Sequence, residues 1–124
     1  MPLCLAAGAL SATLAVQSFT LAWTHSIEKV RWEEDWRIEG RQLAMIEARI
    51  QGFGAGMEPP DDAVLLGGFW HYRPRVAPLD ALNLAHSPYT AGYQICLAGA
   101  CRPLADFLPG IATTATIVLR ACER

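Results

Sequence analysis

The residue types that could carry chemistry are concentrated between positions 25 and 34. His25 to Lys29 reads His-Ser-Ile-Glu-Lys. His25, Ser26 and Glu28 are the types that hydrolases use as base, nucleophile and orienting carboxylate. In an extended backbone, a Ser beside a His cannot readily place its hydroxyl against that imidazole. We therefore expect these side chains to hydrogen-bond the local backbone, with ligand binding as the first functional alternative and hydrolysis as the second.

Glu34 is the sharper anomaly, because it occurs in phase with apolar residues. Alternate positions around it are occupied by Val30, Trp32, Trp36 and Ile38, so all should face one side of a strand. A carboxylate on a buried face must be paired, be protonated or face a cavity. Between Trp rings, Glu34 could bind a cation or an amine. The alternative is that Glu34 lies near the end of a sheet and reaches water.

The Gly-rich segment 52–57 is the third candidate. Gly54, Ala55 and Gly56 could form a nest of backbone N–H groups for an anion. The structural alternative is a tight chain crossing, since neither a phosphate-loop sequence nor a dinucleotide fingerprint occurs. The three histidines are scattered along the chain, so we assign no metal and no cofactor.

Two strands must position these residues. Phe19, Leu21 and Trp23 alternate before the polar segment, and the apolar residues from 30 to 38 alternate after it. At about 3.3 Å per residue, one strand over positions 19–38 would be roughly 65 Å long. A compact domain of this size has a radius of gyration of about 14 Å. The chain must therefore reverse near position 27.

The strand over 30–38 should pair with the segment that follows it. Its other face carries charged residues, which is typical of an antiparallel sheet with one face in water. We predict a three-residue turn, Glu39-Gly40-Arg41, because it sets large rings over small partners. The predicted pairs are Trp36 with Ala44, Trp32 with Ala48, and Val30 with Ile50.

Composition and turn spacing predict the fold class. The 124 residues are 52% hydrophobic and 18% charged, which suits one core, so we expect a single domain over 1–124. The net charge of −2 and the lack of a basic patch argue against nucleic acid as a partner. Short strands between Gly and Pro turns predict an all-β fold, a small antiparallel sandwich or barrel of about eight short strands with at most one short helix, near 103–108.

The N-terminal segment has no formally charged residue between Pro2 and Ile27. That length would suffice for a membrane span, but Gly8 and the many Ala, Ser and Thr residues favour a hairpin. We predict strands at Leu3–Ala6 and Leu10–Val16 with a turn at 7–9. A basic n-region is missing, so we expect a cytoplasmic location by default, with a periplasmic or membrane-associated one as the alternative.

The four cysteines bear on the same question. The segment from Cys96 to Cys101 predicts a hairpin that turns at Ala98-Gly99 and sets the two cysteines opposite each other, with Cα atoms about 4.5 Å apart. That spacing lies at the short end of the disulfide range. We expect reduced thiols, with a disulfide as the alternative. We expect Cys4 and Cys122 to stand alone.

Three motifs resemble a known family: Phe19–Lys29, Trp32-Glu33-Glu34 and Gly52–Met57. They are similar to an uncharacterised family of short bacterial proteins whose genes tend to lie beside the fused membrane permease of TAXI-type TRAP transporters. The likeness covers nearly the whole chain, including the opening hairpin. It implies an accessory role in solute uptake, the permease as partner, and organic anions or amino acids as cargo, but no established activity.

The sequence thus predicts an accessory or small-ligand-binding module for a TRAP-type transporter. The alternatives are a small hydrolase that uses His25 and Ser26, or a purely structural partner of the permease. The predicted ligand-binding residues are His25, Ser26, Glu28, Trp32, Glu34, Gly54, Ala55 and Gly56.

Overall fold

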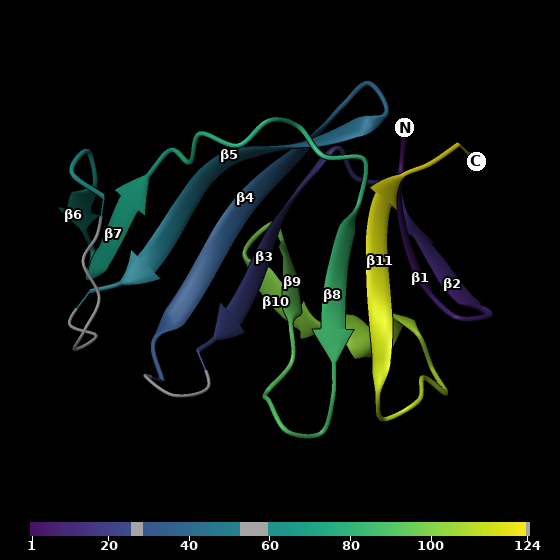
Figure 1. Ribbon diagram of the computed structural model, residues 1–124. Helices are drawn as coiled ribbons and strands as arrows, with labels where there is room; N and C mark the ends of the chain where they lie inside the picture. Colours follow the sequence, from purple (N-terminus) through teal and green to yellow (C-terminus); the bar gives the residue numbers. More distant parts are fainter. Residues whose placement is uncertain (26–28, 53–59, 124) are drawn as a thin grey trace.

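The computed structural model describes residues 1–25, 29–52 and 60–123, which form two antiparallel sheets (Figure 1). The smaller sheet contains β1 (Leu3–Ala7), β2 (Leu10–Leu14), β8 (Leu82–His86) and β11 (Ala115–Ala121). The larger sheet contains β3 (Ser18–Thr24), β4 (Arg31–Glu39), β5 (Gln42–Gln51), β6 (Val64–Leu66), β7 (Phe69–Tyr72), β9 (Gln94–Leu97) and β10 (Ala100–Pro103). A one-turn 3-10 helix, η1 (Leu104–Phe107), follows β10.

The architecture is an all-β sandwich, as the sequence predicts. The strand order is β2-β1-β11-β8 in the smaller sheet and β10-β9-β3-β4-β5-β7-β6 in the larger one. The described residues contain eleven strands instead of about eight, in part because the segment 64–72 forms two paired strands, β6 and β7, on either side of Gly67 and Gly68. No helix in the described ranges is long and apolar enough to cross a membrane.

A hydrophobic core fills the space between the sheets. Alternate residues of each strand point into it, which is the period-2 pattern of sheets with one buried face. Each fully buried large apolar side chain stabilises the fold by about 1.5–3 kcal/mol relative to exposure. The members with at most 1% exposure are Leu3, Leu5, Leu21, Leu43, Ile95, Leu104, Leu108 and Leu119.

The smaller sheet covers only part of the larger one. In Figure 1 it lies on the right, toward the β9 and β10 end of the larger sheet, whereas β4, β5, β7 and β6 extend away from it to the left. The connection between β7 and β8 runs along the upper ends of β5 and β4. Leu43 and Leu79 fix this crossing by exchanging two backbone hydrogen bonds, with N···O distances of 2.7 and 2.8 Å. The inner face of the outlying strands is therefore left without a second strand layer.

The predicted hairpins near the N-terminus and at Cys96–Cys101 are confirmed. β1 and β2 pair from Leu3–Leu14 to Ala7–Leu10, so the turn is Gly8-Ala9, one residue shorter than predicted. β9 and β10 pair Leu97 with Ala100, with Ala98 (φ 50°) and Gly99 (φ 82°) between them. Two consecutive positive φ angles are the mark of a type I′ hairpin turn.

The predicted register of β4 against β5 is wrong. The turn has two residues, Gly40 and Arg41, and Gly40 adopts the positive φ (62°) that this turn needs. Ile46 then bulges out of the ladder, since Asp35 pairs with Glu47 and Trp36 with Met45. A bulge shifts the register by one residue, which alternation on β4 cannot reveal. The observed pairs are Trp32–Ile50, Glu34–Ala48 and Arg37–Ala44, in place of Val30–Ile50, Trp32–Ala48 and Trp36–Ala44.

The cysteines form two disulfides, which corrects the expectation of reduced thiols. Cys4 bonds to Cys122 across 118 residues of sequence, with Cα atoms 5.8 Å apart. They meet because β1 and β11 are neighbours, with Cys4 opposite Arg120. Cys96 bonds to Cys101 across the hairpin, with Cα atoms 3.9 Å apart. Cys96 and Cys101 face each other across the hairpin, as predicted. The Cys4–Cys122 bond could not be predicted, because it depends on which strands are neighbours.

Replacing both Cys4 and Cys122 by Ser should destabilise the fold more than replacing both Cys96 and Cys101. In the chain-entropy description, a loop of separation 118 is worth about 4–5 kcal/mol, and one of separation 5 about 2 kcal/mol. Urea unfolding of the two double variants and the parent chain measures both losses. Equal losses would contradict this expectation.

Candidate ligand-binding site

The junction between β3 and β4 places His25 at one end of the larger sheet. The two strands pair from Ser18–Arg37 to Thr24–Arg31, so the chain reverses near position 27, as predicted. The His25 N–H donates to the Val30 carbonyl at 2.8 Å, and the Lys29 N–H donates to the His25 carbonyl at 2.9 Å. The predicted residues Ser26, Glu28, Gly54, Ala55 and Gly56 lie outside the described residues.

Aromatic rings gather on the inner face beside this junction. Trp23 and Trp32 are register partners, and their rings stack with centroids 6.0 Å apart and an interplanar angle of 17°. Tyr93 tilts against Trp23 at 5.5 Å, and the His25 ring lies 6.5 Å from Trp32. The Trp32 Nε1 atom is buried without a hydrogen-bond partner among the described residues. These rings form a half-buried aromatic wall.

Glu34 lies on the same inner face, as the alternation predicts. Its register partners are Leu21 on β3 and Ala48 on β5, and the Trp36 Nε1–H donates to its Oε1 at 3.2 Å. Burial raises the pKa of Glu34, and the hydrogen bond from Trp36 offsets this only in part. None of the ion pairs in the described ranges includes Glu34.

Two tyrosines approach this carboxylate from other strands. Tyr72 on β7 pairs with Ala48, and Tyr93 directly precedes β9. Burial raises the pKa of both phenols, and the charge of Glu34 raises it further. Both phenols therefore stay neutral at pH 7 and can donate hydrogen bonds.

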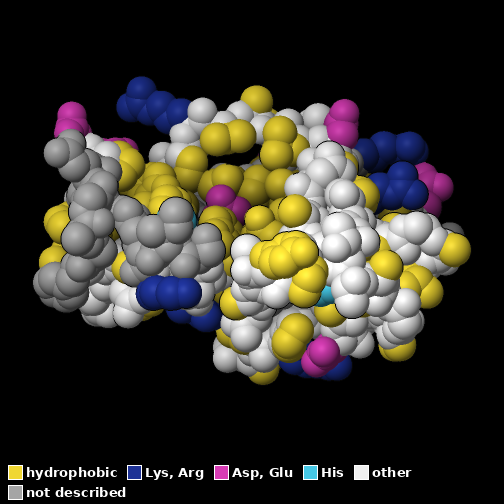
Figure 2. All heavy atoms as spheres, turned by 60° about the horizontal axis from the view of Figure 1, so that its bottom comes forward, with side chains coloured by type: hydrophobic (Ala, Val, Ile, Leu, Met, Phe, Trp, Pro, Cys, Tyr) yellow, Lys and Arg dark blue, Asp and Glu magenta, His cyan; other side chains and the backbone are white. Residues whose placement is uncertain are grey.

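We call Trp23, Trp32, Glu34, Tyr72 and Tyr93 the aromatic pocket. All five side chains are half-buried. Figure 2 shows this end of the sandwich, where hydrophobic side chains surround a hollow that contains an acidic group. The arrangement offers one carboxylate, several π faces and neutral hydroxyl groups to a ligand.

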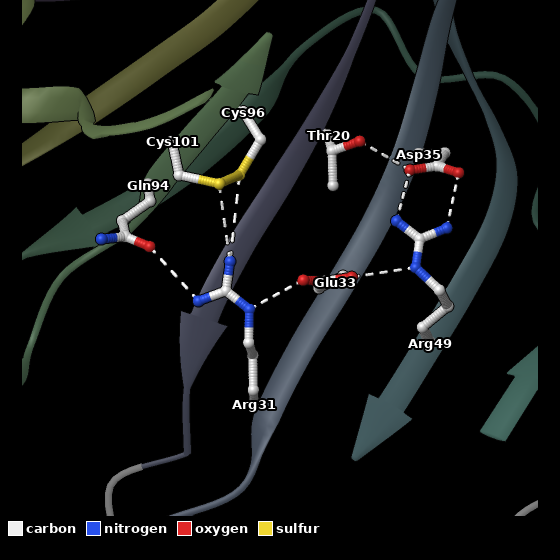
Figure 3. Close-up of a disulfide and its surroundings, with 8 residues drawn as sticks. All are labelled: Thr20, Arg31, Glu33, Asp35, Arg49, Gln94, Cys96 and Cys101. Atoms are coloured by element: carbon white, nitrogen blue, oxygen red, sulfur yellow. Dashed lines mark hydrogen bonds and ion pairs between the residues drawn. A yellow bond between two sulfur atoms is a disulfide. The ribbon is translucent and has the colours of Figure 1, made fainter. Parts of the chain in front are cut away.

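The outer face of the same strands carries a network of ion pairs (Figure 3). Arg49 binds both oxygens of Asp35, at 2.6 and 2.7 Å, and its Nε lies 2.9 Å from Glu33. The bonds from Arg49 hold the pKa of Asp35 below its usual range. Burial raises the pKa of Glu33, but hydrogen bonds from Arg31 and Arg49 outweigh it and lower the pKa. These acids are neutralised, in contrast to Glu34.

Three of the eight predicted site residues are described: His25, Trp32 and Glu34. The structure places Trp32 and Glu34 on one face, with the His25 ring beside Trp32. Sequence reasoning missed Trp23, although it belongs to the same alternation. Tyr72 and Tyr93 carried no sequence signal, because they join the site through the neighbourhood of β7 with β5 and of β9 with β3.

Residues of metal-binding type do not converge in the described ranges, where no three His, Cys, Asp or Glu side chains lie as a metal site requires. The outer-face carboxylates are each held by arginine instead.

The fold and site define a β-sandwich with a half-buried carboxylate among aromatic rings on its inner face. Residues 19–104 match a family described as a domain of unknown function, DUF1850, and the chain belongs to this family. The match spans almost all of the larger sheet together with β8. Comparison with curated proteins found no match, and comparison with solved structures found none.

Glu34→Gln should raise the free energy of unfolding at pH 7. Because burial raises the folded-state pKa of Glu34 above the unfolded value of about 4.3, wild-type stability falls as the pH rises through the folded pKa. The amide of the Glu34→Gln variant does not ionise, so the variant does not lose stability as the pH rises. Denaturant unfolding at pH 4 and pH 7 should show the larger gain at pH 7. Glu39→Gln, an exposed acid on the same strand, is the control with little change at either pH.

Arg49→Met should lower the free energy of unfolding at pH 7 by about 2–3 kcal/mol. Asp35 and Glu33 have lowered folded pKa values, so their contribution is present above the unfolded values near 4 and is lost as the pH falls through the folded ones. The difference in the free energy of unfolding between wild type and variant should therefore shrink toward pH 2–3. Urea unfolding at a series of pH values measures it.

Arg37→Met is the matched control for that variant. The Arg37 side chain is 56% exposed and pairs with exposed Glu39, whereas the Arg49 side chain is 16% exposed. We expect the control to change stability by less than about 1 kcal/mol. An Arg49 variant with a deficit independent of pH would refute the electrostatic account.

Proposed function

We propose that this chain is a small-ligand-binding accessory module of a TAXI-type TRAP solute transporter, and that the aromatic pocket holds the ligand. The observation that carries the proposal is Glu34, a half-buried carboxylate among aromatic rings that joins no ion pair in the described ranges. Burying such a group without a cation costs stability. A local feature that costs stability is expected at functional sites.

The chemistry of the pocket favours a ligand with an ammonium group. The faces of Trp and Tyr rings attract cations, and Glu34 supplies the opposite charge. A bound cation would also favour the ionised form of Glu34. A ligand that carries only carboxylates would be repelled. Of the cargo classes that the family resemblance implies, amino acids and other amines fit better than organic anions.

The transporter association is supported by the sequence resemblance. The DUF1850 family description adds no activity to it. The two disulfides favour an oxidising compartment, which supports the periplasmic alternative. The hydrolase alternative has no observation in its favour, because Ser26 lies outside the described residues.

Amines and amino acids should raise the melting temperature, and matched carboxylates should not. At a ligand concentration of 100 Kd, binding adds about 2.7 kcal/mol of stability. The test uses choline, alkylamines and amino acids against acetate and succinate, read by thermal shift and by Trp fluorescence. Affinity for the amines should increase as the pH rises through the pKa of Glu34, because only the ionised carboxylate pairs with the cation.

Glu34→Gln should abolish the amine effect, and Glu39→Gln should retain it. An equal response to carboxylates, or retained binding in Glu34→Gln, would refute the pocket. Co-purification with a co-expressed TAXI permease tests the partner separately. Amine binding without co-purification would leave the pocket intact and remove the transporter.

A further inference from the structure

The Cys96–Cys101 disulfide lies at the edge of the larger sheet, on the face opposite the aromatic pocket. Cys96 pairs with Thr20, whose hydroxyl donates to Asp35 in the outer-face network. β10 is the edge strand of this sheet. Cys101 is exposed and Cys96 is half-buried, so the two residues differ in their access to solvent.

A guanidinium group is held against both sulfur atoms (Figure 3). The Arg31 Nη2 atom lies 3.7 Å from Cys101 Sγ and 3.9 Å from Cys96 Sγ. Its Nε binds Glu33 at 2.7 Å, and its Nη1 lies 3.3 Å from Gln94 Oε1. These two contacts fix the position of the positive charge.

This charge acts on the reduced form of the pair. A neutral disulfide gains little from a nearby cation, whereas a thiolate beside Arg is stabilised. Glu33 carries one negative charge and shares it between two arginines, because its other oxygen binds Arg49 Nε at 2.9 Å. It therefore cancels only part of the charge of Arg31. Arg31 therefore makes reduction more favourable and makes the departing sulfur a better leaving group.

We propose that Cys96–Cys101 is a thiol–disulfide exchange site that reacts with the dithiol of a partner protein. A thiolate of the partner attacks Cys101 Sγ, the bond between the two cysteine sulfurs breaks, and Cys96 leaves as a thiolate beside Arg31. The partner's second thiolate then attacks the partner's first sulfur, which is bonded to Cys101 in the mixed disulfide, and Cys101 is released. The partner dithiol is oxidised to a disulfide and this pair takes up two electrons. Of the two protons that the partner's thiols lose, one goes to Cys101 and the other to solvent, because Cys96 stays a thiolate beside Arg31.

The strand order selects Cys101 as the sulfur that is attacked. A thiolate approaches in line with the bond that it breaks. For Cys101 this line runs outward over the sheet edge, beyond which no described strand pairs with β10. For Cys96 the approach is from the side of β3, where Thr20 is its register partner. The departing sulfur is thus the shielded one.

Graded reduction with alkylation and peptide mass spectrometry tests the proposal on the oxidised chain. A reduced thioredoxin-type dithiol protein should open Cys96–Cys101 and leave Cys4–Cys122 intact. Arg31→Gln should lower the equilibrium constant for reduction of Cys96–Cys101 at least about tenfold, which is about 30 mV for two electrons. Arg37→Gln is the matched control on the same strand and face, because it pairs with Glu39 and should leave the equilibrium unchanged.

Arg31→Lys separates the effect of charge from the effect of the hydrogen-bond geometry, because Lys keeps a positive charge without the planar guanidinium group. It should retain most of the wild-type equilibrium. The proposal is overturned if Arg31→Gln reduces as readily as the wild type, if Arg31→Lys behaves like Arg31→Gln, or if both disulfides open together.

Discussion

The structure depends on one constraint, the period-2 alternation of side chains along β4. Antiparallel pairing on both sides fixes this strand, so every residue must face either the core or the outer surface. Trp32, Glu34 and Trp36 face inward, whereas Glu33 and Asp35 face outward. The same strand thereby supplies the acid of the aromatic pocket and the acids of the outer-face network.

The two faces treat their carboxylates in opposite ways. On the outer face, Arg49 and Arg31 neutralise Glu33 and Asp35, and the network links the side chains of β3, β4 and β5. On the inner face, Glu34 receives a hydrogen bond from Trp36 and faces aromatic rings. The outer network therefore holds the backbone that presents the uncompensated acid. The outer face adds ion pairs to the stability that the core supplies, and the proposed ligand chemistry lies on the inner face.

Unequal sheet sizes make the inner face accessible. Four strands cannot cover seven, and among the described residues the connection from β7 to β8 crosses the larger sheet where Leu79 bridges to Leu43. The two disulfides lie in different parts of the fold. Cys4–Cys122 joins strands that cover the core, whereas Cys96–Cys101 lies at an exposed edge beside Arg31.

The sequence by itself determined the all-β class, the reversal near position 27, the inward position of Glu34 and the facing of Cys96 and Cys101. Each of these follows from local alternation or from a tight turn, which act within a few residues. Tertiary structure alone decided the Ile46 bulge, the Cys4–Cys122 bond and the approach of Tyr72 and Tyr93 to Glu34. Those features depend on which distant strands become neighbours, and that choice is made by burial of the whole core rather than by any local segment.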